Sequence, residues 1–208
     1  IIELHGERIE GVIHTINDNI SDRINYQDVI SKTIFGTNKI TETILDLNFE
    51  IYMSSFFQTN PLCAEKLYSK VIEYISINEI DEKSIILDLF CGTGTIAQMI
   101  AIKQKKTSVI GVDIVSSAIE NAKKSAQENN IKNVKFYNLD IDNFLFKKPE
   151  LKNKIGVIVL DPPRAGIAKK SIKKIIELDS KKIIYVSCNP STQARDIKIL
   201  IDNGYEIE

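Results

Sequence analysis

The 208-residue sequence contains few of the residues from which metal sites and disulfide frameworks are built: three cysteines and two histidines. Cys63, Cys91 and Cys188 show neither metal-ligand spacing nor a paired framework. The sequence therefore predicts no metal site. The simplest expectation is that the thiols stay reduced, as in the cytoplasm.

The sequence also lacks a long apolar run and an excess of one charge. No run approaches the roughly 18 apolar residues that span a bilayer, and no signal-peptide pattern opens the chain. The formal net charge is −1, so no overall basic field indicates a nucleic-acid partner. These absences predict a cytoplasmic globular protein that does not enter a membrane. No obligate protein partner is expected.

Two features of the ends favour a piece of a longer protein, since the chain lacks an initial methionine and stops abruptly after Tyr205-Glu206-Ile207-Glu208. Residues 1–52 consist of short β-prone runs between Asn, Asp, Ser and Gly, as at the end of an accessory α+β domain. Residues 53–208 are predicted to form the main domain. Its first helix begins near Pro61 and carries an apolar stripe that ends at Ile75.

From residue 85 onward, strand patterns alternate with helix patterns. The strands are continuous Ile, Val and Leu runs, which indicates burial on both faces. This order predicts an α/β fold of the Rossmann-like type, with a doubly wound, mostly parallel sheet. Strands are expected at 85–90, 108–113, 134–138, 155–160, 182–187 and from 205. Helices are expected at 95–103, 116–129, 169–178 and 191–203, and an irregular stretch at 139–154.

A glycine turn follows the first of these strands and contains Gly92 and Gly94. Asp113 ends the next strand, where a carboxylate can hold ribose hydroxyls while the glycines let the backbone approach a ligand. These features fit a dinucleotide or S-adenosylmethionine (SAM) equally well. Asp88, placed to face a cationic amino acid or sulfonium, and Asp140, placed to accept from an adenine amino group, favour SAM.

The motif Asp161-Pro162-Pro163-Arg164 closes another buried strand. Consecutive prolines stiffen the loop, so Asp161 is held at the edge of the sheet at low entropic cost. Many amino-group methyltransferases carry an aromatic residue at the fourth position of such a motif. Arg164 stands there instead and argues against amino-group chemistry.

Cys188 follows a strand and precedes Asn189-Pro190, where Asn189 or Ser191 can cap the next helix. The positive end of a helix dipole favours a thiolate, so Cys188 is the candidate nucleophile. Cys63 and Cys91 are predicted to be structural. A thiolate beside SAM suits carbon 5 of uracil, because addition at carbon 6 turns carbon 5 into a nucleophile. Asp161 could hydrogen-bond the pyrimidine edge and stabilise the developing charge.

Four motifs in this order resemble the RNA 5-methyluridine methyltransferases, and they cover nearly the whole chain. They are Ser55-Phe56-Phe57-Gln58-Thr59-Asn60, the turn 88–95, Asp161-Pro162-Pro163-Arg164-Ala165-Gly166 and Ser187-Cys188-Asn189-Pro190. The resemblance implies methylation of a uridine in structured RNA, 23S rRNA before tRNA, with Cys188 as the nucleophile. It also implies a cofactor pocket lined by Gln58, Phe90, Thr95, Asp113, Asp140 and Asp161.

The sequence departs from this family in two respects. The glutamate that acts as general base in the family is expected beyond residue 208, and Glu206 and Glu208 are not assigned that role. The RNA-binding β-barrel and the iron–sulfur cysteines of some members have no counterpart. The piece is therefore expected to bind SAM but to turn over poorly. A non-catalytic SAM- or RNA-binding module and an NAD-dependent oxidoreductase remain as alternatives.

Lysine clusters are the candidate contacts for RNA, especially the one that follows the Asp161 loop. Each could also be a solvated helix face. The clusters are Lys103, Lys105 and Lys106; Lys147 and Lys148; and Lys169, Lys170, Lys173 and Lys174.

Overall fold

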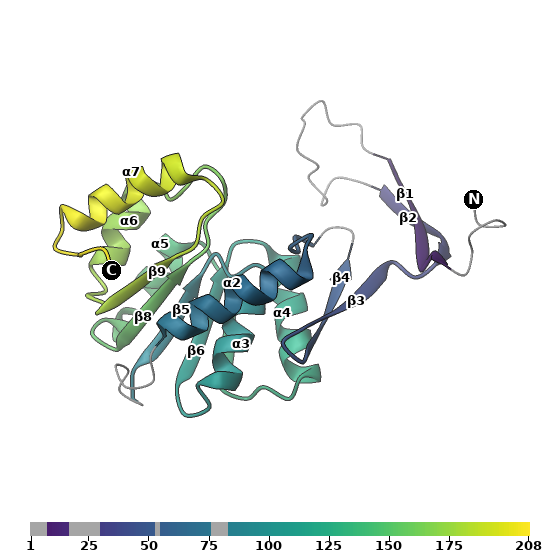
Figure 1. Ribbon diagram of the computed structural model, residues 1–208, viewed down its shortest axis with the longest axis horizontal. Helices are drawn as coiled ribbons and strands as arrows, with labels where there is room; N and C mark the ends of the chain where they lie inside the picture. Colours follow the sequence, from purple (N-terminus) through teal and green to yellow (C-terminus); the bar gives the residue numbers. More distant parts are fainter. Residues whose placement is uncertain (1–7, 17–29, 53–54, 76–82) are drawn as a thin grey trace.

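The computed structural model describes residues 8–16, 30–52, 55–75 and 83–208 (Figure 1). Its central element is a five-stranded sheet in which every neighbouring pair is parallel, in the order β7-β6-β5-β8-β9. The strands are β5 (Ile85–Leu89), β6 (Ser108–Asp113), β7 (Val134–Asn138), β8 (Ile155–Leu160) and β9 (Lys182–Tyr185). The strand order reverses at β5, as in doubly wound folds, so the predicted fold class is confirmed.

Helices cover both faces of this sheet and bury two separate apolar clusters (Figure 1). One cluster includes side chains of α2 (Pro61–Tyr74), α3 (Thr95–Lys103) and α4 (Ser116–Glu128). The other includes side chains of α5 (Ile141–Lys147), α6 (Lys169–Ile176) and α7 (Pro190–Ile201). The strands are therefore buried on both sides, as their continuous apolar runs predicted.

Alternation along β5 determines where its one acidic residue lies. Leu87 and Leu89 belong to the α5–α7 cluster, while Ile86 belongs to the cluster of α2, α3 and α4. Asp88 has the same parity as Ile86 and therefore faces the side of α2 and α3. In the sheet it lies between Gly111 of β6 and Val159 of β8.

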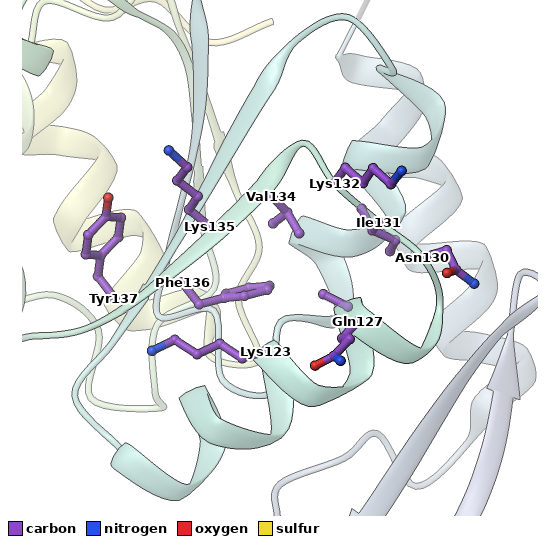
Figure 2. A pocket seen from close by; sticks show the side chains of 10 residues that line it. Lys123, Gln127, Asn130, Ile131, Lys132, Val134, Lys135, Phe136 and Tyr137 are labelled. Atoms are coloured by element: carbon purple, nitrogen blue, oxygen red, sulfur yellow. The ribbon is translucent and has the colours of Figure 1, made fainter.

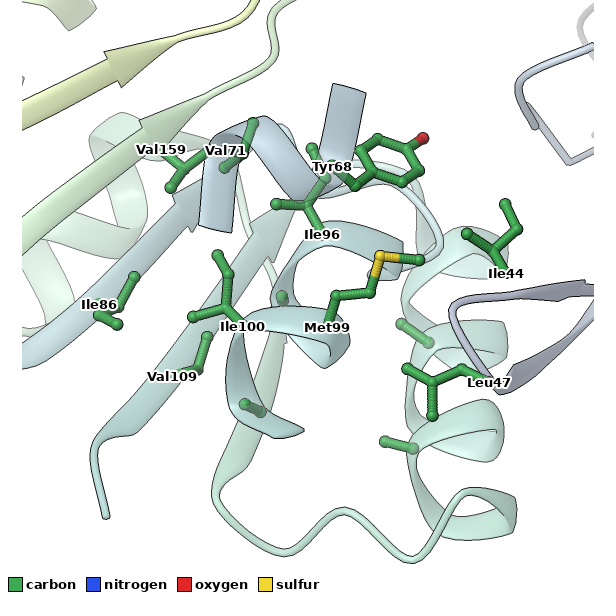
Figure 3. Close-up of a cluster of buried hydrophobic side chains, with 14 of the residues drawn as sticks. Ile44, Leu47, Tyr68, Val71, Ile86, Ile96, Met99, Ile100, Val109 and Val159 are labelled. Carbon is green, nitrogen blue, oxygen red and sulfur yellow. The ribbon is translucent and has the colours of Figure 1, made fainter. Parts of the chain in front are cut away.

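The N-terminal part forms two antiparallel hairpins that differ in burial. In the first, β1 (Gly11–Ile16) pairs with β2 (Ile30–Gly36), and every residue of β2 is exposed. In the second, β3 (Lys39–Ile44) pairs with β4 (Leu47–Tyr52). Ile44 and Leu47 of this second hairpin lie in the same apolar cluster as Met99 and Val109 (Figure 3). The domain boundary at residue 52 stays a prediction, but this packing links β3 and β4 to the main core.

Polar contacts add to the attachment of the second hairpin. Glu50 of β4 forms ion pairs with Lys39 of β3 and with Lys124 of α4, at 2.6 Å for Lys124, and accepts from the Tyr52 hydroxyl at 2.8 Å. The hydrogen bond from Lys124, then those from Lys39 and Tyr52, lower the pKa of Glu50 to about 2. Glu50 is therefore ionised at neutral pH and joins β3, β4 and α4.

Three expectations differ from the observed structure. No strand begins at Tyr205, because its N–H bonds to Leu200 O near the end of α7 and its hydroxyl donates to Ser180 O just before β9. Strand β3 was not predicted, because its polar and apolar residues are mixed. The stretch 139–154, expected to be irregular, contains α5 and a short 3-10 helix at Pro149–Leu151. Helix α5 has only seven residues, too few for a periodic signal.

Candidate active site

The carboxyl edge of the sheet gathers the acids and the thiol that the sequence singled out. Asp88 lies near the end of β5, Asp113 ends β6, and Asp161 follows β8. Negative charge on Asp161 and on Asp113 raises the pKa of Asp88, so the three carboxylates share one electrostatic environment. This edge is where open α/β sheets bind their ligands.

Asp88 is completely buried, and neither of its carboxylate oxygens has a partner within hydrogen-bond geometry among the described residues, although the backbone amide of Ala97 lies near enough to oppose the rise in its pKa. Its pKa is raised well above the usual value, chiefly by burial and then by the charges of Asp161 and Asp113. A buried carboxylate without a partner is costly unless a cation or donor pairs with it. Asp88 is therefore suited to a cationic ligand group.

Asp161 is half-buried and is fixed to the sheet by its backbone. Its N–H donates to Leu89 O at 3.4 Å, which places it directly beside the end of β5. Burial raises the pKa of Asp161 to about 6. A carboxyl group with this pKa can gain or lose its proton near neutral pH. This property suits a group that hydrogen-bonds the edge of a reacting base.

The glycine turn between β5 and α3 is held by backbone contacts to Asp113. Gly92 N–H donates to Asp113 Oδ2 at 2.9 Å, and Val115 N–H donates to Asp113 Oδ1 at 2.8 Å. Both carboxylate oxygens are therefore oriented, and each retains a lone pair for a further donor. Phe90 adopts φ 64°, a left-handed conformation that is uncommon for an aromatic residue and is concentrated at functional turns.

The two glycines of the turn have different surroundings. A Cβ on Gly94 would lie 2.5 Å from the Phe136 ring and 2.9 Å from Ala122 Cβ, so this glycine allows close packing of the turn on β7 and α4. A Cβ on Gly92 would meet nothing within 4 Å. Open space therefore lies over Gly92, where a ligand can approach the backbone.

Thr95 and Asp140 are both part of helix starts. Thr95 is buried as the first residue of α3, and its hydroxyl lies 3.4 Å from that of Thr93. Asp140 is the N-cap of α5: it accepts from Asn143 N–H at 2.8 Å and also from the Asn143 side chain. These hydrogen bonds, the backbone one first, lower the pKa of Asp140. Asp140 thus has a capping role that the sequence analysis did not foresee.

Gln58 is positioned by the residues around it. Ser55 accepts from Asn121 of α4 at 3.2 Å, and the Phe57 ring packs against Phe49 with centroids 6.1 Å apart. Asn60 caps α2 by accepting from Cys63 N–H at 3.1 Å. Gln58 lies between these anchored residues, and its side chain forms a hydrogen bond with Tyr68 of α2.

Tyr68 also belongs to this site. From the sequence it was expected only to lie in the apolar stripe of the helix that begins near Pro61. It is buried on α2, and burial, followed by the charges of Asp161 and Asp88, raises the pKa of its hydroxyl (Figure 3). The hydroxyl therefore stays protonated. One feature of the sequence could have indicated this role: Tyr68 is a tyrosine among aliphatic residues, on the helix that directly follows the motif containing Gln58.

Cys188 is exposed between β9 and α7. The turn around it is rigid, because Ser187 Oγ donates to Asn189 O at 3.1 Å and accepts from Asn189 N–H at 3.0 Å. Asn189 caps α7 by accepting from Ser191 N–H at 3.2 Å, so this predicted cap is confirmed. The thiol is therefore accessible at the carboxyl edge, next to a helix N-terminus.

Cys91 and Cys63 differ from Cys188. Burial, then the charges of Asp88 and Asp113, raise the pKa of the Cys91 thiol well above its usual value, which makes it a poor nucleophile. Cys63 is exposed on α2 and donates its backbone N–H to the Asn60 cap. Cys188 is thus the best candidate nucleophile of the three.

The described residues contain no group of three or more His, Cys, Asp or Glu side chains that could hold a metal ion. No helix in the described part of the chain is long and apolar enough to cross a membrane. A surface groove between α4 and β7 is lined by Lys123, Ile131 and Phe136 among others (Figure 2), and no Asp is among the described residues that line it.

The lysines of α6 are partly paired within the protein. Lys170 Nζ lies 2.8 Å from Asp142 Oδ2, and Lys174 Nζ lies 3.6 Å from Asp142 Oδ1. The hydrogen bond from Lys170 lowers the pKa of Asp142. This cluster therefore presents less unpaired positive charge than its sequence suggested.

The chain is similar to proteins described as RNA methyltransferases. A protein of Clostridium acetobutylicum described as an uncharacterized RNA methyltransferase is 42% identical over 200 residues, which are 96% of this chain and 42% of that protein. A protein of Caldanaerobacter subterraneus with the same description is 39% identical over 198 residues, 95% of this chain and 42% of that protein. The chain thus spans less than half the length of these relatives.

A solved structure is also similar. The tRNA (uracil-54, C5)-methyltransferase of Pyrococcus abyssi, in complex with S-adenosyl-L-homocysteine, matches with a TM-score of 0.71 and 31% identity. The match covers 91% of this chain and 44% of that one. The sequence model of a family described as a methyltransferase domain matches residues 80–206, more than half of the chain. The chain therefore belongs to the methyltransferase domain family.

Proposed function

We propose that this chain is the catalytic part of a SAM-dependent methyltransferase that acts on carbon 5 of a uridine in RNA. The observation that carries the proposal is an exposed thiol, Cys188, on the same sheet edge as the half-buried Asp161 and the unpartnered Asp88. The related RNA methyltransferases and the solved uracil-C5 enzyme support the reaction class.

The residues present fit SAM. It carries two cationic groups, the sulfonium and the ammonium of its amino acid part, and the buried Asp88 carboxylate lacks a hydrogen-bond partner among the described residues. Asp113, oriented by two backbone amides, retains lone pairs for ribose hydroxyls. The open space over Gly92 leaves room for the backbone to approach the cofactor. We propose that Gln58, Phe90, Gly94, Thr95, Asp140 and Asp161 complete the pocket.

When bound, SAM supplies an electrophilic methyl group. The Cys188 thiolate would add to carbon 6 of the uracil, and the electron pair of the 5,6 double bond would become available at carbon 5. Asp161 would hydrogen-bond the pyrimidine edge and stabilise charge on its oxygen. After carbon 5 accepts the methyl group, a base removes the carbon 5 proton and the Cys188 sulfur leaves. We assign no described residue as that base.

We favour 23S rRNA over tRNA as the substrate, whereas the solved relative is named as a tRNA methyltransferase. Both pools therefore belong in the assay. The full-length protein is incubated with unmodified transcripts of each RNA and deuterated-methyl SAM, and nucleosides are analysed by mass spectrometry. We expect labelled 5-methyluridine in one pool and none with Cys188→Ala. Labelled methyl on any other nucleoside would overturn the proposal.

Two alternatives have less support. An NAD-dependent oxidoreductase would use the glycine turn and Asp113 but has no role for Cys188, and the matching family model is that of a methyltransferase domain. A non-catalytic module would bind SAM or RNA without methyl transfer. Wild-type protein that binds SAM yet leaves every transcript unlabelled would favour the module.

A further inference from the structure

One face of α7 holds the acid loop, which we define as residues 161–167 between β8 and α6. The Arg164 carbonyl accepts from Asn189 Nδ2 at 3.0 Å and from Thr192 Oγ1 at 3.2 Å. Arg195 Nη2 donates to Ala165 O at 3.1 Å and to Ile167 O at 3.3 Å. Asn189, Thr192 and Arg195 recur at intervals of three residues and so lie on the same side of the helix.

Asp196 is the centre of these contacts and is completely buried. Its Oδ2 accepts from Ile167 N–H at 2.8 Å and from the Tyr185 hydroxyl at 2.8 Å. Its Oδ1 accepts from Arg195 Nε at 2.8 Å, with Nη2 at 2.7 Å. Ile167 ends the acid loop, and Tyr185 ends the strand that leads to Cys188. One carboxylate therefore links the two segments that carry the proposed reacting groups.

The loop approaches α7 closely at Gly166. This glycine adopts φ +74°, and a Cβ there would lie 2.6 Å from both Arg195 Nη2 and Asp196 Oδ2. The approach places the loop backbone within hydrogen-bond distance of α7. Burial, and then the hydrogen bond to Asp196, raise the pKa of Tyr185, which keeps its hydroxyl a donor.

We propose that Asp196 is a positioning residue for methyl transfer: it fixes the second half of the acid loop to the end of β9 and so sets where Arg164 and its neighbours lie relative to Cys188. The inference rests on the function proposed above. Asp161 N–H is bonded to Leu89 O, so its own backbone is also held by the sheet. Asp196 therefore acts mainly on the part of the loop from Pro163 to Ile167.

The expected consequence is a defect in the chemical step. Addition of the thiolate to carbon 6 requires the reacting atoms at about 3–3.5 Å, and a misplacement of about 1 Å can cost about 100-fold in rate. The groups proposed to bind the cofactor lie mainly around β5 and β6, and Asp161, the one in the acid loop, is held by the sheet through Leu89 O. Loss of the Asp196 contacts should therefore lower the rate of methyl transfer more than it weakens SAM binding.

The test measures single-turnover methyl transfer in the full-length protein at saturating SAM and RNA, well below the unfolding temperature of each variant. Asp196→Asn should slow transfer by about 30-fold or more and Tyr185→Phe by about tenfold. The SAM dissociation constant should stay within about threefold of wild type. Thr192→Val, which loses the hydroxyl bonded to Arg164 O, should slow transfer, and Thr192→Ser should restore it.

Tyr205→Phe is the matched control for Tyr185→Phe. Tyr205 is also partly buried, and its hydroxyl donates to Ser180 O at 2.9 Å, away from the acid loop. It should lose comparable stability and keep its transfer rate within about twofold of wild type. If Asp196→Asn and Tyr185→Phe lost only stability, as Tyr205→Phe does, the positioning role would be refuted.

Amide hydrogen exchange separates this inference from the proposed function. Exchange of residues 164–167 should become at least about tenfold faster in Asp196→Asn and stay unchanged in Tyr205→Phe. A wild-type protein that methylates no uridine would overturn the proposed function, and the positioning role with it, whatever the exchange result. Unchanged exchange in Asp196→Asn would overturn the positioning role alone.

Discussion

Asp88 and Asp196 are both completely buried in the same domain, yet their surroundings are opposite. Asp196 accepts hydrogen bonds from Ile167, Tyr185 and Arg195. Asp88 has no partner among the described residues. A buried carboxylate is tolerated when donors surround it, and an unpartnered one is costly. The α7 side is therefore complete without a ligand, whereas we propose that a bound cationic group completes the β5 side.

The largest contrast is expected when each acid is changed to its amide. Asp196→Asn places an amide group against the Arg195 guanidinium and leaves donors without acceptors, so we expect a loss of about 2–3 kcal/mol in the free energy of unfolding. Asp88→Asn removes an unpartnered carboxylate and should gain about 1 kcal/mol. Urea unfolding at pH 7 measures both.

The same two variants should differ in cofactor binding. Calorimetry should show SAM affinity reduced at least about tenfold by Asp88→Asn and changed little by Asp196→Asn, since a charged hydrogen bond contributes about 1.5–3 kcal/mol. Equal losses of stability in the two variants would show that Asp88 has internal partners after all. The distinction between the two sides would then fail.

Asp161 should make stability depend on pH. Its folded-state pKa is about 6, above the usual value of 3.8, so the folded protein holds this proton more strongly than the unfolded chain. Stability from this group is therefore fully present below pH 4 and falls as the pH rises toward 6, by about 2–3 kcal/mol. Asp88, whose pKa is also raised, adds in the same direction.

Urea unfolding measured from pH 4 to 7 tests this dependence. Asp161→Asn should flatten the profile, and saturating SAM should reduce the slope in wild type, because its cationic groups favour the carboxylate. Equal slopes in wild type and Asp161→Asn between pH 4 and 6 would contradict the assigned burial effect.

Two glycines extend the contrast to the backbone. Gly166→Ala would bring a Cβ to 2.6 Å from Arg195 and Asp196 at φ +74°, so we expect a loss of about 2–3 kcal/mol. Gly92→Ala meets no atom within 4 Å and should cost only about 1 kcal/mol, from its φ of +52°. In calorimetry only Gly92→Ala should weaken SAM binding directly, because its Cβ enters the space left for the ligand.

The smallest expected effect concerns the lysines of α6. Lys170 is already paired with Asp142, so Lys170→Gln should change the salt dependence of RNA binding less than Lys169→Gln or Lys173→Gln does. Each lysine that neutralises a phosphate contributes about 0.7–0.9 to the slope of log affinity against log salt. Filter binding at several salt concentrations measures the slopes, and three unchanged slopes would identify this face as merely solvated.

The sheet and its carboxyl edge were predictable because their signals are local. Continuous apolar runs mark strands that are buried on both sides, and the polar residue that follows each run lies at the same edge. For this reason Asp88, Asp113, Asp161 and Cys188 could be placed from the sequence. Whether they bind cofactor and substrate stays a prediction.

The rest depended on contacts between distant residues. Asp196 bonds to Ile167, 29 positions away, and a buried acid on a helix cannot be told from a solvated one by its neighbours in sequence. Helix α5 depends on the Asp140 cap and on packing of Phe144 more than on periodicity. The strand expected from Tyr205 failed for the same reason, since Tyr205 bonds through its N–H to Leu200 O and through its hydroxyl to the distant Ser180 O.

The most direct test of the central claim is the mass of the protein after reaction with SAM and an RNA that carries 5-fluorouridine. Fluorine at carbon 5 cannot be removed as a proton, so thiol addition and methyl transfer should stop at a covalent adduct, independently of the base. We predict a methylated RNA–protein adduct that maps to Cys188 and is absent in Cys188→Ala. An adduct on another residue, or none with SAM bound, would contradict the claim.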